Sequence, residues 1–321
     1  LNLPHPFSSR ISSVRRKHKV RSALSQAGLP NPRFSVCADW PSTLEAARKI
    51  GFPLVIKPAD LASSAYVRLV EDESSLLAAV EQLRKFTLNF RNQPREPIWL
   101  LEEYMTGEEV SVEAVSYKGK TTVIGITDKS LTGFPHFIED GHMFPADLAP
   151  ALAADIAEFV CRVLEAVGHD HGISHTEVKL TRDGPRLVEI NPRPGGNYIV
   201  ELIQRVTGID LINTHIELSL NRDPDLSGID HARGSAAVKF LVPEKEGILM
   251  AIKGKEHLES NTNIHRWDLK AALGQKIYPP IDNACYLGFV IAHDNIGHGA
   301  RRIAEKAISE LKPEIEAEKE I

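Results

Sequence analysis

Residues 177–191 carry acidic side chains at a spacing that suits metal binding. The triplet Arg182-Asp183-Gly184 predicts the turn of a β-hairpin, because an alternating run lies on each side of it. Folding the chain about Asp183 places Glu177 opposite Glu189, and directly paired residues share one face of a sheet. The side chains expected on that face are Glu177, Lys179, Glu189 and Asn191, with Arg193 just beyond, whereas Val178, Leu180, Val188 and Ile190 point into a core.

Two opposed carboxylates repel each other, and a divalent cation would remove that repulsion. Carboxylate and amide oxygens are the hard ligands that suit Mg²⁺ carrying the phosphates of a nucleotide. Arg193 would then lie beside the metal and hold an anion. The alternative is an ordinary amphipathic hairpin with a charged, solvated face. The continuation into a Gly-rich loop, Asn191-Pro-Arg-Pro-Gly-Gly196, argues against this alternative.

The composition is that of an ordinary globular protein. The chain has 321 residues, of which 42% are hydrophobic and 25% charged, with a net charge of −5. These values predict two or three subdomains and give no sign of a nucleic-acid or membrane partner. Three isolated cysteines, Cys37, Cys161 and Cys285, suit a reducing cytoplasm. Because the chain begins at Leu1 and carries an early basic run, we expect it to be part of a longer polypeptide.

The elements that must position these residues follow from periodicity and breaker residues. Helices are expected at 13–27, 42–51 (from a capping box at Ser42 and Glu45), 74–86, 150–167, 198–207, 211–220 and 300–311. Strands are expected at 54–56, 66–70, 98–102, 110–117, 121–127, 236–242, 248–252 and 286–292, besides the hairpin. Residues 128–149 lack a period and predict a functional loop, and residues 314–321 predict a frayed, solvated tail.

Three further stretches hold residues that suit a nucleotide. Lys57 follows an apolar strand, so its ammonium can reach a phosphate while its stem stays packed. Ser63 and Ser64 lie between two strands and suit a phosphate loop. Glu102 and Glu109 flank a short link containing a glycine, where carboxylates accept an amine or ribose hydroxyls. Taken singly, these residues could equally be a surface lysine, turn serines and solvated charges.

In this order, the motifs resemble those of the ATP-grasp family of carboxylate–amine ligases. The resemblance covers roughly residues 13–220, and the last hundred residues fit the family's C-terminal subdomain more loosely. It implies an α+β ATP-grasp fold, in which two α+β subdomains grip ATP and a C-terminal α/β subdomain follows. The expected divisions are a linker and lysine helix (1–52), a lid (53–127), a catalytic subdomain (128–225) and a C-terminal subdomain (226–321). The family's usual N-terminal domain is largely absent.

The resemblance also implies roles for residues that bind the nucleotide. Lys17 and Lys57 correspond to the lysines that reach its phosphates, and Ser63 and Ser64 to the phosphate loop, which here lacks the usual glycines. The adenine-contacting residues are Glu102, Glu103, Tyr104 and Met105, with Glu102 at the adenine amino group. Glu109 corresponds to the ribose-binding glutamate.

The remaining roles concern the metal and the substrate. Glu177, Glu189 and Asn191 match the Mg²⁺ ligands, with Mn²⁺ as an alternative ion. Arg193 matches the catalytic arginine that steadies the acyl phosphate, which Gly195 and Gly196 would let the backbone approach.

Glu139 and His142 resemble the Glu-x-Gly-His segment of the L-amino-acid (dipeptide) ligase branch. In that branch the acid and the imidazole face the substrate, so Glu139 would pair with its ammonium and His142 would assist catalysis. The alternative is a loop pair without a ligand. His169, His171 and His175 look like a metal cluster, but their position before the hairpin favours a hydrogen-bonding role for His175.

We therefore expect a cytoplasmic ligase that activates a carboxylate as an acyl phosphate and joins it to an amine, with amino acids as substrates. The products would be ADP and phosphate, the cofactors ATP and Mg²⁺, and the partners small molecules, with homodimerisation left open. One alternative is a carboxylase-type or nucleotide-biosynthesis enzyme of the same fold. Another is an ATP-binding module without catalysis within a larger protein.

Overall fold

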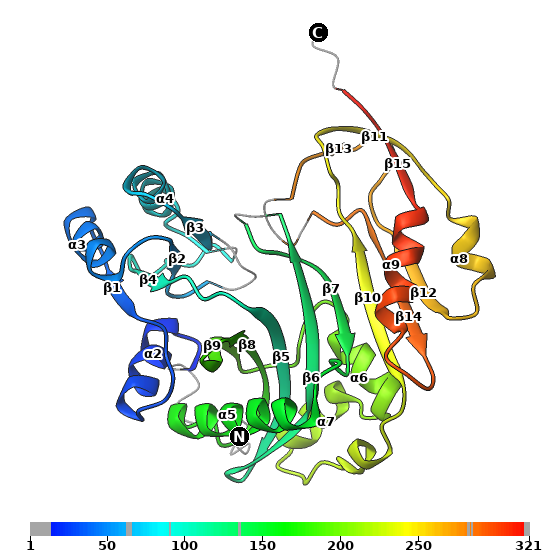
Figure 1. Ribbon diagram of the computed structural model, residues 1–321, viewed down its shortest axis with the longest axis horizontal. Helices are drawn as coiled ribbons and strands as arrows, with labels where there is room; N and C mark the ends of the chain where they lie inside the picture. Colours follow the sequence, from blue (N-terminus) through cyan, green and yellow to red (C-terminus); the bar gives the residue numbers. More distant parts are fainter. Residues whose placement is uncertain are drawn as a thin grey trace.

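The computed structural model describes residues 14–61, 66–89, 91–133, 136–280, 283 and 285–317. Its strands form three sheets, arranged side by side in Figure 1. Among the described residues no helix is long and apolar enough to cross a bilayer.

A small antiparallel sheet in the order β1-β4-β2-β3 forms the first layer, which we call the small-sheet layer (residues 34–103). Its elements are β1 (Phe34–Cys37), α3 (Trp40–Ile50), β2 (Leu54–Pro58), β3 (Arg68–Val70), α4 (Glu73–Lys85) and β4 (Trp99–Glu103). The apolar side chains of α3 and α4 pack on the sheet around Leu54, Ile56 and Leu101, which are buried. Helix α3 is capped by Asp39 and not by Ser42 as expected, because the Asp39 carboxylate accepts the Ser42 N–H.

An eight-stranded sheet in the order β12-β14-β10-β7-β6-β5-β8-β9 forms the centre of the molecule. Its strands are β5 (Glu108–Tyr117), β6 (Lys120–Thr132), β7 (Ile138–Phe144), β8 (Gly172–Thr181), β9 (Gly184–Asn191), β10 (Ser235–Leu241), β12 (Ile264–Leu269) and β14 (Gly288–Asp294). Helices α5 (Pro150–Val167), α2 (Lys17–Gln26), α6 (Ile199–Thr207) and α7 (Leu211–Ser219) and the 3₁₀ helix η1 (Ser227–His231) surround it.

The alternation of side chains along β5 separates the core of this sheet from the site. Val110, Val112 and Ala114 pack with α5 and α2 in one buried cluster. Because successive strand residues point to opposite faces, Glu109, Ser111 and Glu113 lie on the other face, although they too are buried. The large sheet therefore presents a row of enclosed polar side chains on the face opposite α5.

The C-terminal part adds a third sheet, in the order β13-β11-β15. It consists of β11 (Gly247–Lys253), β13 (Lys276–Ile277) and β15 (Lys312–Glu316), with α8 (Glu256–Ser260) and α9 (Ala300–Glu310) beside it. Residues 312–316 thus form a strand that pairs with β11, so the frayed tail expected at 314–321 was wrong for residues 314–316. Strands β1 and β12 were not predicted from the sequence.

Two further expectations need correction. The predicted lid, 53–127, does not follow the sheets, because β5 and β6 belong to the large sheet and β1 belongs to the small one. The division falls at the link 104–107. Residues 128–149 are not an aperiodic loop but contain the end of β6 and the whole of β7. Polar residues such as Lys129, Glu139 and His142 interrupt the apolar alternation there, which hid the strands.

Candidate active site

The β8–β9 hairpin pairs Glu177 with Glu189 and His175 with Asn191, which confirms the predicted register. The turn is nevertheless shorter than expected, since Thr181 pairs with Gly184, and a β-bulge beside Glu177 restores the register. Val188 is the extra residue of this bulge. We had predicted Val188 in the core, but it lines the cavity described next. Leu187 takes its place in the core.

A cavity of about 710 Å³, including its mouth, lies between the small-sheet layer and the large sheet. The structure brings to it most residues predicted for the nucleotide, together with two of the predicted metal ligands: Lys57, Glu102, Glu103, Tyr104, Met105, Glu109, Glu177 and Glu189. It is also lined by Val55, Val67, Lys129, Leu131, Phe137, Lys179 and Val188. Ser63 and Ser64 lie outside the described residues.

Glu102 is held at the back of this cavity by what we call the Arg21 cluster, consisting of Arg21, Lys57 and Glu102. Arg21 donates Nε and Nη2 to the two Glu102 oxygens at 2.8 and 3.0 Å, and Lys57 Nζ lies 2.7 Å from Oε2. All three side chains are buried. Burial alone would raise the pKa of Glu102, but the two cations outweigh it and lower the pKa to about 2. Both carboxylate oxygens are thus already bound, so contact with an adenine amino group stays a prediction.

Arg21 also connects this cluster to the hairpin. Its Nη1 and Nη2 donate to the main-chain oxygens of Leu187 and Val188 at 2.8 and 3.0 Å. These are the two consecutive carbonyls beside the bulge on an edge strand. A slip of one residue would turn Glu189 to the other face of the sheet. The contacts of Arg21 therefore favour the register in which the two acids are opposed.

A second group, which we call the Lys129 cluster, consists of Lys129, Glu109, Glu139 and Glu177. The Lys129 ammonium lies 2.7, 3.0 and 3.0 Å from Glu109, Glu139 and Glu177, respectively. Burial opposes a charged Lys129, but the three carboxylates dominate and raise its pKa well above the usual value. Lys179 contacts Glu109 at 3.0 Å. Glu109, the expected ribose ligand, is therefore bound by two ammonium groups.

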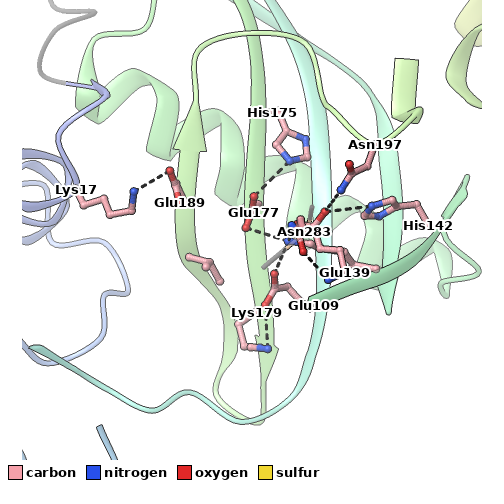
Figure 2. A network of polar contacts seen from close by, with 12 residues as sticks. Lys17, Glu109, Glu139, His142, His175, Glu177, Lys179, Glu189, Asn197 and Asn283 are labelled. Atoms are coloured by element: carbon pink, nitrogen blue, oxygen red, sulfur yellow. Dashed lines mark hydrogen bonds and ion pairs between the residues drawn. The ribbon is translucent and has the colours of Figure 1, made fainter. Parts of the chain in front are cut away.

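The two opposed acids of the hairpin have different partners (Figure 2). Glu189 lies 3.0 Å from Lys17 Nζ, which also donates to the Leu61 carbonyl oxygen at 2.5 Å. Glu177 contacts Lys129 and lies 3.4 Å from His175 Nε2. Although burial raises the pKa of Glu177, Lys129 and His175 outweigh it and bring the pKa to about 2. Both hairpin acids are therefore held close to cations within the protein itself.

His175 lies between Glu113 and Glu177 and contacts both carboxylates, in agreement with its predicted hydrogen-bonding role. Its Nδ1 lies 2.5 Å from the buried Glu113 carboxylate, and its Nε2 faces Glu177. Burial lowers the pKa of His175, but the two carboxylates raise it to about 10. His175 is thus an imidazolium that orients Glu177.

Glu139 and His142 lie together on β7, as Figure 2 shows. Asn197 Nδ2 donates to Glu139 Oε2 at 2.5 Å. His142 Nε2 lies 3.3 Å from the same oxygen, but without the alignment of a hydrogen bond, and neither ring nitrogen has a hydrogen-bond partner among the described residues. This fully buried imidazole can therefore still bind a ligand or water, as can the Ser111 hydroxyl and one Glu113 oxygen on the same face of the sheet.

The residues that follow the hairpin agree less well with their predicted roles at the acyl phosphate. Arg193 is exposed, and its Nη1 donates to the Pro194 carbonyl oxygen at 2.8 Å. No described carboxylate forms an ion pair with it. A Cβ on Gly195 would lie 3.1 Å from His175 Nδ1 and 3.0 Å from the Ile199 side chain, whereas a Cβ on Gly196 would meet nothing within 4 Å. The lack of a side chain is thus needed for packing at Gly195, where His175 and Ile199 lie close, but not at Gly196.

Three residues of the site were missed in the sequence, namely Arg21, Lys129 and Asn197. Arg21 follows Lys17 by one helical turn, so both lie on the same face of α2, and that spacing was available as a signal. Lys129 was hidden because its strand was taken for a loop. Asn197, with a φ of 46°, belongs to a left-handed stretch that no sequence pattern indicated.

The hairpin suits a hard metal ion by its donor chemistry. Glu177, Glu189 and Asn191 supply carboxylate and amide oxygens from adjacent strands. Within the described ranges, no group of three or more His, Cys, Asp or Glu side chains has the arrangement of a metal site. A donor set of two acids and an amide stays a prediction, and the ammonium groups of Lys17 and Lys129 contact those acids directly.

The cavity between a small and a large sheet is the arrangement that the sequence resemblance predicted, and comparison with known proteins agrees. Residues 50–201 match the ATP-grasp domain, and residues 239–316 match the L-amino acid ligase C-terminal domain 2. The chain therefore belongs to the ATP-grasp family. Its C-terminal part, which fitted only loosely in the sequence, carries the domain found in L-amino acid ligases.

Individual relatives support this assignment. The chain is 30% identical to human carnosine synthase 1 over 224 residues (67% of this chain, 27% of the relative). It is 29% identical to the alanine–anticapsin ligase of Bacillus subtilis over 235 residues (67% and 48%). The crystal structure of the L-amino acid ligase from Bacillus licheniformis superposes with a TM-score of 0.82 at 24% identity, over 96% of this chain and 75% of that one. The chain thus spans less than half the length of carnosine synthase 1 and of the alanine–anticapsin ligase.

Proposed function

We propose that this chain uses ATP to activate a carboxylate and to join it to an amine, with amino acids as the substrates. The main support is the β8–β9 hairpin, whose opposed Glu177 and Glu189 face a cavity lined by lysines on both sides. The match to an L-amino acid ligase domain and the likeness to two named ligases support the substrate class.

In this proposal the nucleotide lies in the cavity between β4 and the large sheet. Tyr104, Met105 and Lys57 line this cavity; Tyr104 and Met105 would contact the adenine, and Lys57 would face the phosphates. Lys129 lines the same cavity, and Lys17 contacts Glu189 of its lining; both are buried, and preorganised positive charge of this kind lowers the energy of a phosphoryl-transfer transition state. We expect the small-sheet layer to close over ATP and exclude water.

Glu177, Glu189 and Asn191 would hold Mg²⁺, which would neutralise phosphate charge and orient the phosphates when bound. Lys17 and Lys129 would then move from the acids toward phosphate oxygens. Glu139 would accept the ammonium of an amino-acid substrate, with its carboxylate held ionised, since Lys129 and His142 outweigh burial and keep its pKa well below the usual value. The positioned carboxylate and amine would react without a nucleophilic side chain of the protein.

A phosphate-release assay tests this function. The purified chain is incubated with Mg-ATP and an equimolar pool of the twenty standard amino acids, and then with bicarbonate in their place. Release that depends on amino acids, together with a new amide product detected by mass spectrometry, is expected. Release that depends only on bicarbonate would indicate a carboxylase-type enzyme, and nucleotide binding without release would indicate a non-catalytic module. Either result would contradict the proposal.

A further inference from the structure

The main chain of Glu139 is held by side chains that come from the C-terminal domain. Strand β10 pairs with β7 only from Phe144 to Gly141 and then diverges. Residues 138–140 therefore have no β10 partner on that side. The N–H and the C=O of one strand residue point to the same side, so both groups of Glu139 need partners there.

Asn283 and Tyr286 supply these partners. The Glu139 N–H donates to Asn283 Oδ1 at 3.1 Å, and the Tyr286 hydroxyl donates to the Glu139 carbonyl oxygen at 2.6 Å. Figure 2 shows Asn283 directly beside Glu139, although the two residues are 144 positions apart in the chain. Two side chains thus replace one rung of a sheet.

The aromatic ring of Tyr286 is itself fixed in place. It stacks on Phe240 of β10 with centroids 4.1 Å apart and an interplanar angle of 14°. The edge of His142 meets the same Phe240 ring, with centroids 6.4 Å apart. Burial, reinforced by the nearby Glu139 charge, raises the pKa of Tyr286, so its hydroxyl remains a donor across the physiological range. The hydroxyl therefore approaches Glu139 from a rigid support.

We propose that Asn283 and Tyr286 are positioning residues, by which the C-terminal domain sets the place of Glu139 and thereby the affinity for the amino-acid substrate. This inference rests on the proposed function, since it takes Glu139 as the acceptor of the substrate ammonium. It assigns the C-terminal domain a part in substrate binding, while nucleotide binding depends on other elements. Neither residue lines the cavity proposed for the nucleotide.

The test uses Tyr286→Phe, which keeps the stacked ring and removes only the hydroxyl. We expect the concentration of the amino-acid pool at half-saturation to rise about tenfold, as for the loss of one buried hydrogen bond, with the KM for ATP unchanged. Hydrogen exchange of the peptide covering 138–144 should become faster, while exchange in the small-sheet layer stays the same. Asn283→Ala should act in the same direction. Tyr278→Phe is the matched control, because Tyr278 is 52% exposed, and it should change neither quantity.

The outcomes separate the two proposals. If Glu139→Gln leaves the amino-acid dependence intact, the proposed role of Glu139 in function is wrong. If Glu139→Gln weakens that dependence but Tyr286→Phe alters neither half-saturation nor exchange at 138–144, the positioning role is wrong. If Tyr286→Phe weakens the dependence on ATP and on amino acids equally, its role is only structural. In the double variant the effect of Tyr286→Phe on half-saturation should disappear, since the carboxylate that it positions is gone.

Discussion

The Arg21 cluster and the Lys129 cluster lie at two ends of one site and have opposite charge balances. In the Arg21 cluster two cations surround one carboxylate, and every oxygen of Glu102 is bound. In the Lys129 cluster one ammonium faces three carboxylates. Lys179 beside Glu109 and His175 beside Glu113 and Glu177 add two cations and one acid, so four carboxylates face three cations there. The remaining negative charge attracts cations, so this end suits a metal ion and a substrate ammonium. The end with surplus positive charge holds the two sheets together, because Arg21 binds both Glu102 of β4 and main-chain oxygens of β9.

The largest effect should come from removing a hairpin acid. Glu189→Ala is expected to lower ATP turnover by about 10³-fold, because it takes away one of the two opposed carboxylates. The fold should persist, as measured by circular dichroism and thermal unfolding. Asp183→Ala, at the exposed turn of the same hairpin, is the control and should keep normal turnover. Near-normal turnover of Glu189→Ala would overturn the metal assignment.

Removing the charge of Arg21 from the Arg21 cluster should instead lower the stability of the fold. Arg21→Met leaves Glu102 buried with one partner and two carbonyls of β9 unpaired, so we expect a loss of about 3–5 kcal/mol in the free energy of unfolding. Urea denaturation measures this loss. Arg33→Met is the matched control, because the Arg33–Glu103 pair is exposed at the Arg33 side chain and should contribute less than about 1 kcal/mol. Equal losses in the two variants would show that the buried Arg21 contacts stabilise the fold no more than an exposed ion pair does.

Arg193 tests the reaction at the negative end. We expect Arg193→Ala to lower kcat by about 10²-fold while changing ATP affinity far less, because its charge would act on the acyl phosphate. Nucleotide affinity is measured by titration calorimetry and kcat by phosphate release. Arg182→Ala, at the exposed hairpin turn, serves as the control. Equal losses in kcat and affinity would exclude the transition-state role.

Acid should weaken the Arg21 cluster in a defined range of pH. The pKa of Glu102 is about 2 in the folded protein against 4.5 for an ordinary glutamate, so its depressed pKa stabilises the fold fully above pH 4.5. That contribution, on the order of 2–3 kcal/mol, is lost as the pH falls from 4.5 toward 2. Urea denaturation across this range should show a smaller decline for Arg21→Met than for the wild type. Identical slopes would mean that Arg21 does not lower the pKa of Glu102.

The smallest expected effect compares two adjacent glycines. Gly195→Ala should cost about 1 kcal/mol, because its methyl group would press on His175 and Ile199, which support the negative end. Gly196→Ala should change stability by less than about 0.5 kcal/mol, since its methyl group would enter open space. Thermal unfolding resolves the two. A larger cost at Gly196 would show that the loop is packed differently.

Local patterns in the sequence determined much of this protein. The period of two on each side of Asp183 set the opposition of Glu177 and Glu189, and the apolar run before Lys57 predicted its strand. Strand alternation is a short-range property, so it can be read from neighbouring residues. The strand positions of the predicted ligand residues on such regular elements were accordingly confirmed.

Tertiary structure alone decided the rest. The bulge at Val188, the choice of β5 and β6 for the large sheet, and the meeting of Lys129 with three carboxylates all depend on contacts between elements remote in the chain. Glu139 is the clearest case, since its main chain is fixed by Asn283 and Tyr286 from the opposite end of the sequence. Such contacts carry no periodic signal, because a hydrogen bond between distant side chains depends on how the sheets pack and not on the residues beside it.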